Sequence, residues 1–131
     1  MRTIRGVWSV SLVAVALLAS AVVPATASPS NKWRIEVNHD AGSAGEIVFK
    51  LSPVGGQPLE VRVSVAEGTT ENHVAKTIRD AFVAQLPAEG FHIEVDDGED
   101  VLVKKAHSAA DFDMMVVSST VGNVTLNLDK E

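Results

Sequence analysis

The stretch DDGED, Asp96–Asp100, places four carboxylates around one glycine. Carboxylate oxygens are the ligands that calcium prefers, and one ion takes about six to eight oxygens. The stretch lacks the ligand spacing of an EF-hand loop, and neighbouring side chains diverge in a tight hairpin. The sequence therefore favours a solvated turn whose charges discourage edge-to-edge aggregation, with calcium binding as the alternative. The candidate metal ligands are Asp96, Asp97, Glu99 and Asp100.

The histidines form no recognisable metal motif. No two of them stand four residues apart on the expected helix, and the His-Glu-x-x-His pattern is absent. His92 and Glu94 share one face of an expected strand and could supply two ligands, but we favour a surface pair without a metal. The four histidines are His39, His73, His92 and His107.

Nucleophilic catalysis finds no support in the local sequence. No serine lies in a Gly-x-Ser-x-Gly pattern, and none has a base close by in the sequence. The chain has no cysteine, which excludes disulfides, thiolate catalysis and cysteine-bound zinc. We therefore identify no catalytic residue and expect no cofactor. Enzyme activity is not expected, although residues distant in the sequence can assemble a site.

Two kinds of large apolar side chain could lie either in the core or at a partner. Trp33 continues the inward alternation of Ile35 and Val37, so we expect it in the core. The alternative is a role as an anchor for a partner, where tryptophan is enriched. Met114 and Met115 point to opposite faces of one strand. One of them should therefore be buried, and the other is left for a partner surface or a covering loop.

The first 27 residues have the three parts of a secretory signal peptide. Arg2 and Arg5 give a positive start, Val7–Ala21 is mostly apolar, and Ala25-Thr26-Ala27 is a small-x-small cleavage site. Cleavage after Ala27 would leave a single domain, residues 28–131. We expect a secreted or periplasmic protein of bacterial origin. The alternative is an uncleaved membrane anchor, for which the apolar run is short.

The charge of the expected mature domain is strongly negative. Without the two arginines of the signal, the 11 Lys and Arg fall to nine against 17 Asp and Glu, a formal charge of −8. Binding to phosphate groups needs clustered cations. Nucleic acids are therefore not expected as partners, nor are anionic membrane surfaces once the signal is removed.

Alternating apolar and polar residues predict seven strands in this domain. LEVRVSV is the clearest, with four aliphatic residues on one face and Glu60, Arg62 and Ser64 on the other. The expected strands are Trp33–Val37, Glu46–Ser52, Leu59–Val65, Phe91–Val95, Val101–Lys105, Phe112–Ser119 and Asn123–Asp129.

One segment has the period of an amphipathic helix, about Glu71–Leu86. Thr69 and Thr70 offer side-chain oxygens to cap its first N–H groups, and Pro87 follows its end. Its apolar stripe needs a surface, which a one-sided antiparallel sheet provides. The sequence thus predicts an α+β fold, mainly antiparallel, in one sheet or two short sheets with the helix packed across.

Turn residues predict three hairpins. Pro53–Pro58 joins the second and third strands, and its paired glycines and prolines are typical of such a connection. Asp97-Gly98 fits a two-residue type I′ turn, because both central positions of that turn need positive φ. We expect a last hairpin around Val121-Gly122.

The segment Glu46–Lys105 resembles a ββαββ module found in phage tail sheath and tail tube proteins and in some bacterial surface proteins. The resemblance rests on LEVRVSV, the linker and helix AEGTTENHVAKTIRDAF, and the hairpin FHIEVDDGEDVLVKKA. It implies a structural module without catalytic residues. A secretory signal departs from phage virion components.

These observations favour a non-catalytic binding or assembly module that pairs with another protein through a sheet edge or a loop. One alternative is an inhibitor of a secreted hydrolase, presenting the loop Asn38–Gly45 or Ala106–Asp111, or a small hydrolase itself. Another is a fragment of a calcium-dependent adhesin that uses the acidic turn. The sequence leaves the oligomeric state open.

Overall fold

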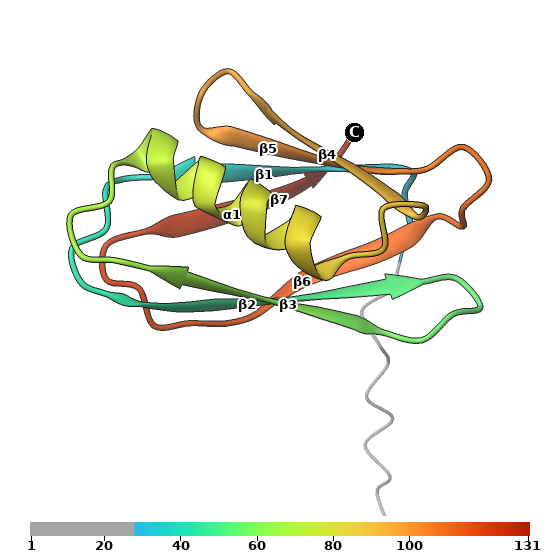
Figure 1. Ribbon diagram of the computed structural model, residues 1–131, viewed down its shortest axis with the longest axis horizontal. Coiled ribbons are helices and arrows are strands. Elements are labelled where there is room, and N and C mark those ends of the chain that lie inside the picture. The colour runs from blue at the N-terminus through green and yellow to red at the C-terminus, as the bar shows by residue number, and fades with distance from the viewer. Residues whose placement is uncertain (1–27) are drawn as a thin grey trace, which may run out of the picture.

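The computed structural model describes residues 28–131, and the predicted signal peptide with its cleavage site lies outside the described residues. Within these residues one helix and seven antiparallel strands form two sheets, which confirms the predicted α+β class (Figure 1). The strands are β1 (Lys32–Asn38), β2 (Gly45–Pro53), β3 (Leu59–Val65), β4 (Phe91–Asp96), β5 (Asp100–Lys105), β6 (Phe112–Ser119) and β7 (Thr125–Lys130), and the helix is α1 (Glu71–Gln85).

The order of the strands within each sheet differs from their order along the chain. One sheet has the order β3-β2-β6 and the other β4-β5-β1-β7. The β2–β3 and β4–β5 hairpins form as expected, each within one sheet. The ββαββ segment therefore places its two hairpins in different sheets. Its helix is flanked by both sheets instead of lying on one.

The predicted hairpin between β6 and β7 is wrong. β6 pairs with β2 and β7 pairs with β1, so the connection around Val121-Gly122 crosses from one sheet to the other. Val121 is buried at 6% exposure, which places the connection against the core instead of in solvent. It also runs close to β2, since a Cβ on Gly45 would lie 2.5 Å from the Thr120 carbonyl carbon. Two strands and a turn signal do not distinguish a hairpin from such a crossover.

The helix lies in the gap between the two sheets along one side of the molecule (Figure 1). It contacts β3 of one sheet and β4, β5 and β1 of the other. Its buried side chains include Val74, Ile78 and Phe82, and the Phe82 ring meets Phe49 of β2 edge to face at 5.0 Å. The helix therefore closes one side of a two-sheet sandwich, which agrees with the two short sheets that the sequence allowed beside a single sheet.

The core lies between the inner faces of both sheets. Trp33 is 6% exposed and its Nε1 donates to the Phe112 carbonyl at 2.8 Å, which confirms its predicted place in the core. Phe91 and Phe112 join the two sheets edge to face at 5.2 Å. Across residues 28–131, no buried side-chain nitrogen or oxygen lacks a hydrogen-bond partner. The interior is thus apolar and its few polar groups are satisfied.

The helix begins where expected, but its cap comes from a distant loop. Thr70 occupies the N-cap position and its side chain caps no backbone N–H; it bonds His73 instead. Asp40, in the loop after β1, accepts the Glu71 N–H at 2.8 Å. Glu71 in turn accepts the His39 N–H at 2.6 Å. A carboxylate at a helix N-terminus also faces the positive end of the helix dipole. The predicted capping by the two threonines is therefore wrong, because the fold brings in a stronger acceptor.

The acidic turn is one residue longer than predicted. Asp97 and Gly98 both have positive φ, 49° and 80°, as a type I′ turn requires. However, Asp96 pairs with Asp100, so three residues separate the strands. The extra residue, Glu99, gives its carbonyl to the Val37 N–H at 3.1 Å, so β1 holds it in place. The sequence of the turn alone does not reveal this third strand.

Replacing Asp40 by alanine should lower the free energy of unfolding by about 1 kcal/mol, because the helix loses the acceptor at its start. Asp40→Asn keeps a side-chain oxygen and should retain most of that stability. Thr70→Ala serves as the control and should cost much less, since this hydroxyl caps no N–H group. Urea unfolding of the three variants measures the differences. A larger loss for Thr70→Ala than for Asp40→Ala would contradict the assigned cap.

Candidate functional site

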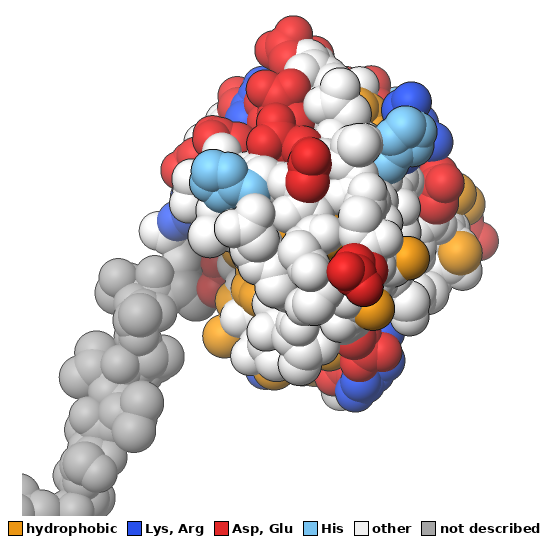
Figure 2. All heavy atoms as spheres, turned by 90° about the vertical axis from the view of Figure 1, so that its left-hand side faces the viewer, with side chains coloured by type: hydrophobic (Ala, Val, Ile, Leu, Met, Phe, Trp, Pro, Cys, Tyr) orange, Lys and Arg blue, Asp and Glu red, His pale blue; other side chains and the backbone are white. Residues whose placement is uncertain are grey.

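The acidic turn is organised by an arginine from β1. Arg34 contacts Asp96, with 3.3 Å from its Nη2 to an Asp96 oxygen, and it also pairs with Asp100 and Glu131. Its side chain is only 22% exposed. Figure 2 shows acidic side chains gathered at the top of the end of the molecule that carries this turn. Arg34 thus offsets part of the charge that the turn concentrates.

The four candidate metal ligands do not converge in this arrangement. Two of them, Asp96 and Asp100, are engaged by Arg34, while Asp97 and Glu99 occupy the turn itself. In the part of the chain that is described, no group of three or more His, Asp or Glu side chains is placed to hold a metal ion. Calcium binding stays the untested alternative to the solvated turn that the sequence favours, and the geometry shows an ion-pair cluster.

Arg34 changes the titration of Glu131. Its hydrogen bond to Glu131 is the largest cause that holds the pKa of that carboxyl below its usual range. The hydrogen bonds from Arg34 to Glu131 and Asp100 in turn raise the pKa of Arg34. On the same sheet, the hydrogen bond from Lys104 lowers the pKa of Glu94. Both carboxylates are therefore favoured in their charged forms by the folded state.

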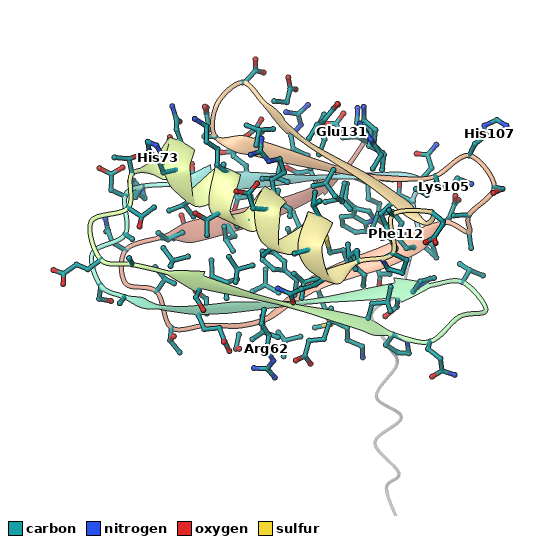
Figure 3. All side chains as sticks on the ribbon, viewed as in Figure 1. Arg62, His73, Lys105, His107, Phe112 and Glu131 are labelled. Atoms are coloured by element: carbon teal, nitrogen blue, oxygen red, sulfur yellow. The ribbon has the colours of Figure 1, made fainter. Side chains whose placement is uncertain are left out.

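The histidines remain scattered, as the sequence indicates. His92 and Glu94 do form a surface pair, with 3.5 Å between Nε2 and Oε2, and Lys104 completes it at 2.6 Å from Glu94. His73 lies at the start of the helix and His107 at the opposite end of the molecule (Figure 3).

The two loops that the sequence offers as inhibitor loops lie at opposite ends of the molecule. Different contacts hold each of them in place. In the Asn38–Gly45 loop, Ala41 is buried, its N–H donates to Thr69 and its carbonyl accepts from Gly68. That loop supports the start of the helix. The Ala106–Asp111 loop is held by the Lys105–Asp111 ion pair at 3.0 Å.

The edge of β6 that faces away from β2 is one of the strand edges of the fold without a neighbouring strand. Phe112 directs its N–H and carbonyl away from β2, since both bond Ser30. Alternation along the strand turns the Met114 N–H to the same edge, where the Asp113 side chain accepts it at 3.1 Å. β6 ends its sheet in the described residues, so the rest of this edge presents backbone groups without a neighbouring strand.

The edge of β3, on the other side of the same sheet, is partly covered by a side chain of the helix. There the side chain of Gln85, at the end of the helix, accepts the Arg62 N–H at 2.9 Å and donates to the Arg62 carbonyl at 2.7 Å. One amide thus satisfies the outward N–H and carbonyl of Arg62, in the middle of this edge. The helix therefore protects β3, and nothing equivalent protects β6 beyond Met114 within residues 28–131.

An apolar patch adjoins the open edge on the outer face of the three-stranded sheet. Met115 and Val117 of β6 are each 51% exposed, while Met114 is buried at 4%, as one methionine of the pair was expected to be. Val48 of β2 lies on the outer face opposite Ser118 and is only 5% exposed. Arg62, the partner of Val48 on β3, points outward beside it (Figure 3). We call Val48, Met115 and Val117 the outer patch.

Sequence reasoning missed two features of this edge. It did not single out Val48, because its neighbours Ile47 and Phe49 define the inward face of β2. It also did not foresee the β-bulge opposite Val48 and Phe49, where β6 carries an extra residue. The run MMVVSS, without charge or proline near the end of a strand, was the signal available for an unprotected edge.

Comparison with known proteins gives no family. No family model matches the chain, and neither does any curated protein. A crystal structure of the D2-D3 domains of the flagellar cap protein FliD from Escherichia coli is similar over 81% of this chain and 86% of that chain, at 18% identity and a TM-score of 0.28. So low a TM-score does not establish a shared fold, and the role of that protein is not transferred to this chain. The resemblance to ββαββ modules stays an interpretation of the sequence.

Among the described residues, no helix is long and apolar enough to span a bilayer. The predicted export to a secreted or periplasmic location rests on residues 1–27 and stays a prediction.

Replacing Arg34 by methionine should lower the free energy of unfolding at pH 7 by about 1 kcal/mol, because three carboxylates lose a shared cation. The effect should fade in acid. The folded pKa of Glu131 is depressed, so its contribution is present above the pKa of the unfolded chain and is lost as pH falls through the folded pKa. Wild type and variant should therefore converge between about pH 5 and pH 3.

Urea unfolding across this pH range measures the convergence. Arg79→Met is the control, since among residues 28–131 Arg79 pairs only with its exposed neighbour Asp80. Curves for Arg34→Met and wild type that stay parallel down to pH 3 would contradict the assigned cluster.

Proposed function

We propose that this protein is a non-catalytic assembly module that takes an extended segment of a partner protein as an added strand along β6. The observation that carries the proposal is the difference between the two edges of the three-stranded sheet. On β3 the outward N–H and carbonyl of Arg62 are occupied by Gln85 of the helix, while β6 is open beyond Met114 in the described structure. Open strand edges are sites where a second chain pairs by main-chain hydrogen bonds.

The side chains around this edge suit a protein partner. Met115 and Val117 supply exposed apolar surface beside the edge, and methionine adapts its shape to different neighbours. From Met114 to Ser119 the strand carries no charge, although Asp and Glu exceed Lys and Arg by six over the whole chain. A partner strand can therefore approach without burying an unpaired charge.

The inner side of the same edge is also incompletely covered. Val116 of β6 and Leu126 and Leu128 of β7 pack against the core but are only partly buried. By contrast, Val61 and Val63 of β3, next to the helix, are at most 1% exposed. The side of the sandwich away from the helix thus retains apolar surface that an added strand would cover, and burial of apolar area favours association.

Site-specific photo-crosslinking tests the proposal in the producing cell. A photoreactive residue at Met115 should crosslink to an extended segment of one partner protein, identified as crosslinked peptides by mass spectrometry. The same residue at Val83, a 59% exposed valine on the helix, is the matched control and should give no such product. If both positions give the same products or none, the proposal fails.

Replacing Val117 by lysine should weaken partner binding about tenfold or more, because the ammonium group must lose water at a pairing surface. Val83→Lys should leave binding unchanged, and both variants should melt within a few degrees of wild type. Native mass spectrometry distinguishes a partner protein from a second copy of the chain. Unchanged binding by Val117→Lys would contradict the assigned edge.

A further inference from the structure

A pocket of about 280 Å³ lies at the end of the molecule opposite the acidic turn. Lysine ammonium groups dominate its lining, and no carboxylate side chain belongs to it. Figure 3 places Lys105 and His107 at this end. The lining residues are Asn31, Lys32, Lys104, Lys105 and His107. Three of the nine cations among residues 28–131 therefore meet at one concave site in an acidic protein.

Strand register brings two of these lysines together. Lys32 of β1 lies directly opposite Lys104 of β5, and Lys105 follows on the same strand. The Lys105 N–H donates to the Asn31 carbonyl at 2.9 Å, which fixes the segment that carries Asn31. Like charges directly opposite each other on a sheet destabilise it. The fold keeps this arrangement although a neutral residue at either position would remove the repulsion.

Two carboxylates offset the lysines from outside the pocket. Glu94 lies 2.6 Å from the Lys104 Nζ, and Asp111 lies 3.0 Å from the Lys105 Nζ. Neither carboxylate lines the cavity. Lys32 forms no close ion pair in the described structure, although its charge is near enough to Glu131 to help lower the pKa of that carboxyl. The pocket therefore faces an incoming group with hydrogen-bond donors and positive charge, while the carboxylates hold two of the lysines in place.

We propose that this pocket binds a tetrahedral oxyanion, a phosphate or sulfate group. Lysine recognises such a group as a point charge with three donors, whereas a planar carboxylate is matched better by the forked guanidinium of arginine, which this pocket lacks. The side chains of Lys104 and Lys105 are only 35% and 28% exposed, so part of their hydration is already lost before binding. The bound anion would also relieve the repulsion between Lys32 and Lys104.

The site is independent of the proposed strand addition. It lies on β1 and β5 of the four-stranded sheet, while the outer patch lies on β2 and β6 of the other sheet. The oxyanion group has two sources, a free inorganic ion or the terminal group of a larger molecule such as a phosphorylated or sulfated sugar. Both present the same chemistry to the lysines.

Calorimetric titration of the purified protein tests the site, with inorganic phosphate, inorganic sulfate and a sugar phosphate as separate ligands. Chloride keeps the ionic strength constant, so that general screening does not imitate binding. We expect saturable binding of phosphate or sulfate with one site per chain. Tighter binding of the sugar phosphate than of the free ion would assign the larger molecule as the source, and equal binding would assign the free ion.

Lys32→Gln is the deciding variant, because it removes one ammonium group without leaving a carboxylate unpaired. We expect the affinity to fall about tenfold, and Lys104→Gln to act in the same direction. Lys76→Gln, on the exposed face of the helix, removes the same charge elsewhere and should bind as wild type. Absence of saturable binding, full affinity in Lys32→Gln, or an equal loss in Lys76→Gln would overturn the proposal. Strand addition at β6 would be unaffected by any of these results.

Discussion

The fold depends on burial of one helix face between two sheets. Val74, Ile78 and Phe82 are fully buried, and the helix contacts β3 on one side and β4, β5 and β1 on the other. Neither sheet alone covers this stripe, and neither sheet closes its inner face without the helix. The chain has no cysteine, so no disulfide can link the two sheets. This apolar contact joins them instead. The cap from Asp40 ties the start of the helix to the loop after β1.

Placing the helix on one side makes the two sides of the sandwich unequal. β3 gains the amide of Gln85, which satisfies the outward N–H and carbonyl of Arg62. β6 and β7 lie away from the helix and keep partly buried Val116 and Leu128 at their edges. The same packing that stabilises the domain therefore leaves the side of β6 and β7 uncovered by the helix in the described residues. A partner strand there would cover the β6 side of the sandwich, as the helix covers the β3 side.

The outer faces of the two sheets share one arrangement, a buried aliphatic residue opposite an arginine. Each has an aliphatic residue that is buried although it faces away from the core: Leu102, opposite Arg34, and Val48, opposite Arg62. Each arginine also pairs with carboxylates, which fixes its position over the sheet. On the four-stranded sheet the acidic cluster lies at the turn and the lysines lie at the other end. The charges of this face are thus separated by strand register.

The sequence by itself determined the order of elements, the inward faces and the α+β class, because period and turn residues are local properties of the chain. It also indicated that Trp33 is in the core and that Asp97 and Gly98 take positive φ. Only the tertiary structure decided that β6 and β7 belong to different sheets, that Asp40 caps the helix, and that Arg34 holds Asp96 and Asp100. The pairing of Lys32 with Lys104 is of the same kind. Each of these contacts joins residues more than 25 positions apart, where register and packing of the whole domain choose the partner.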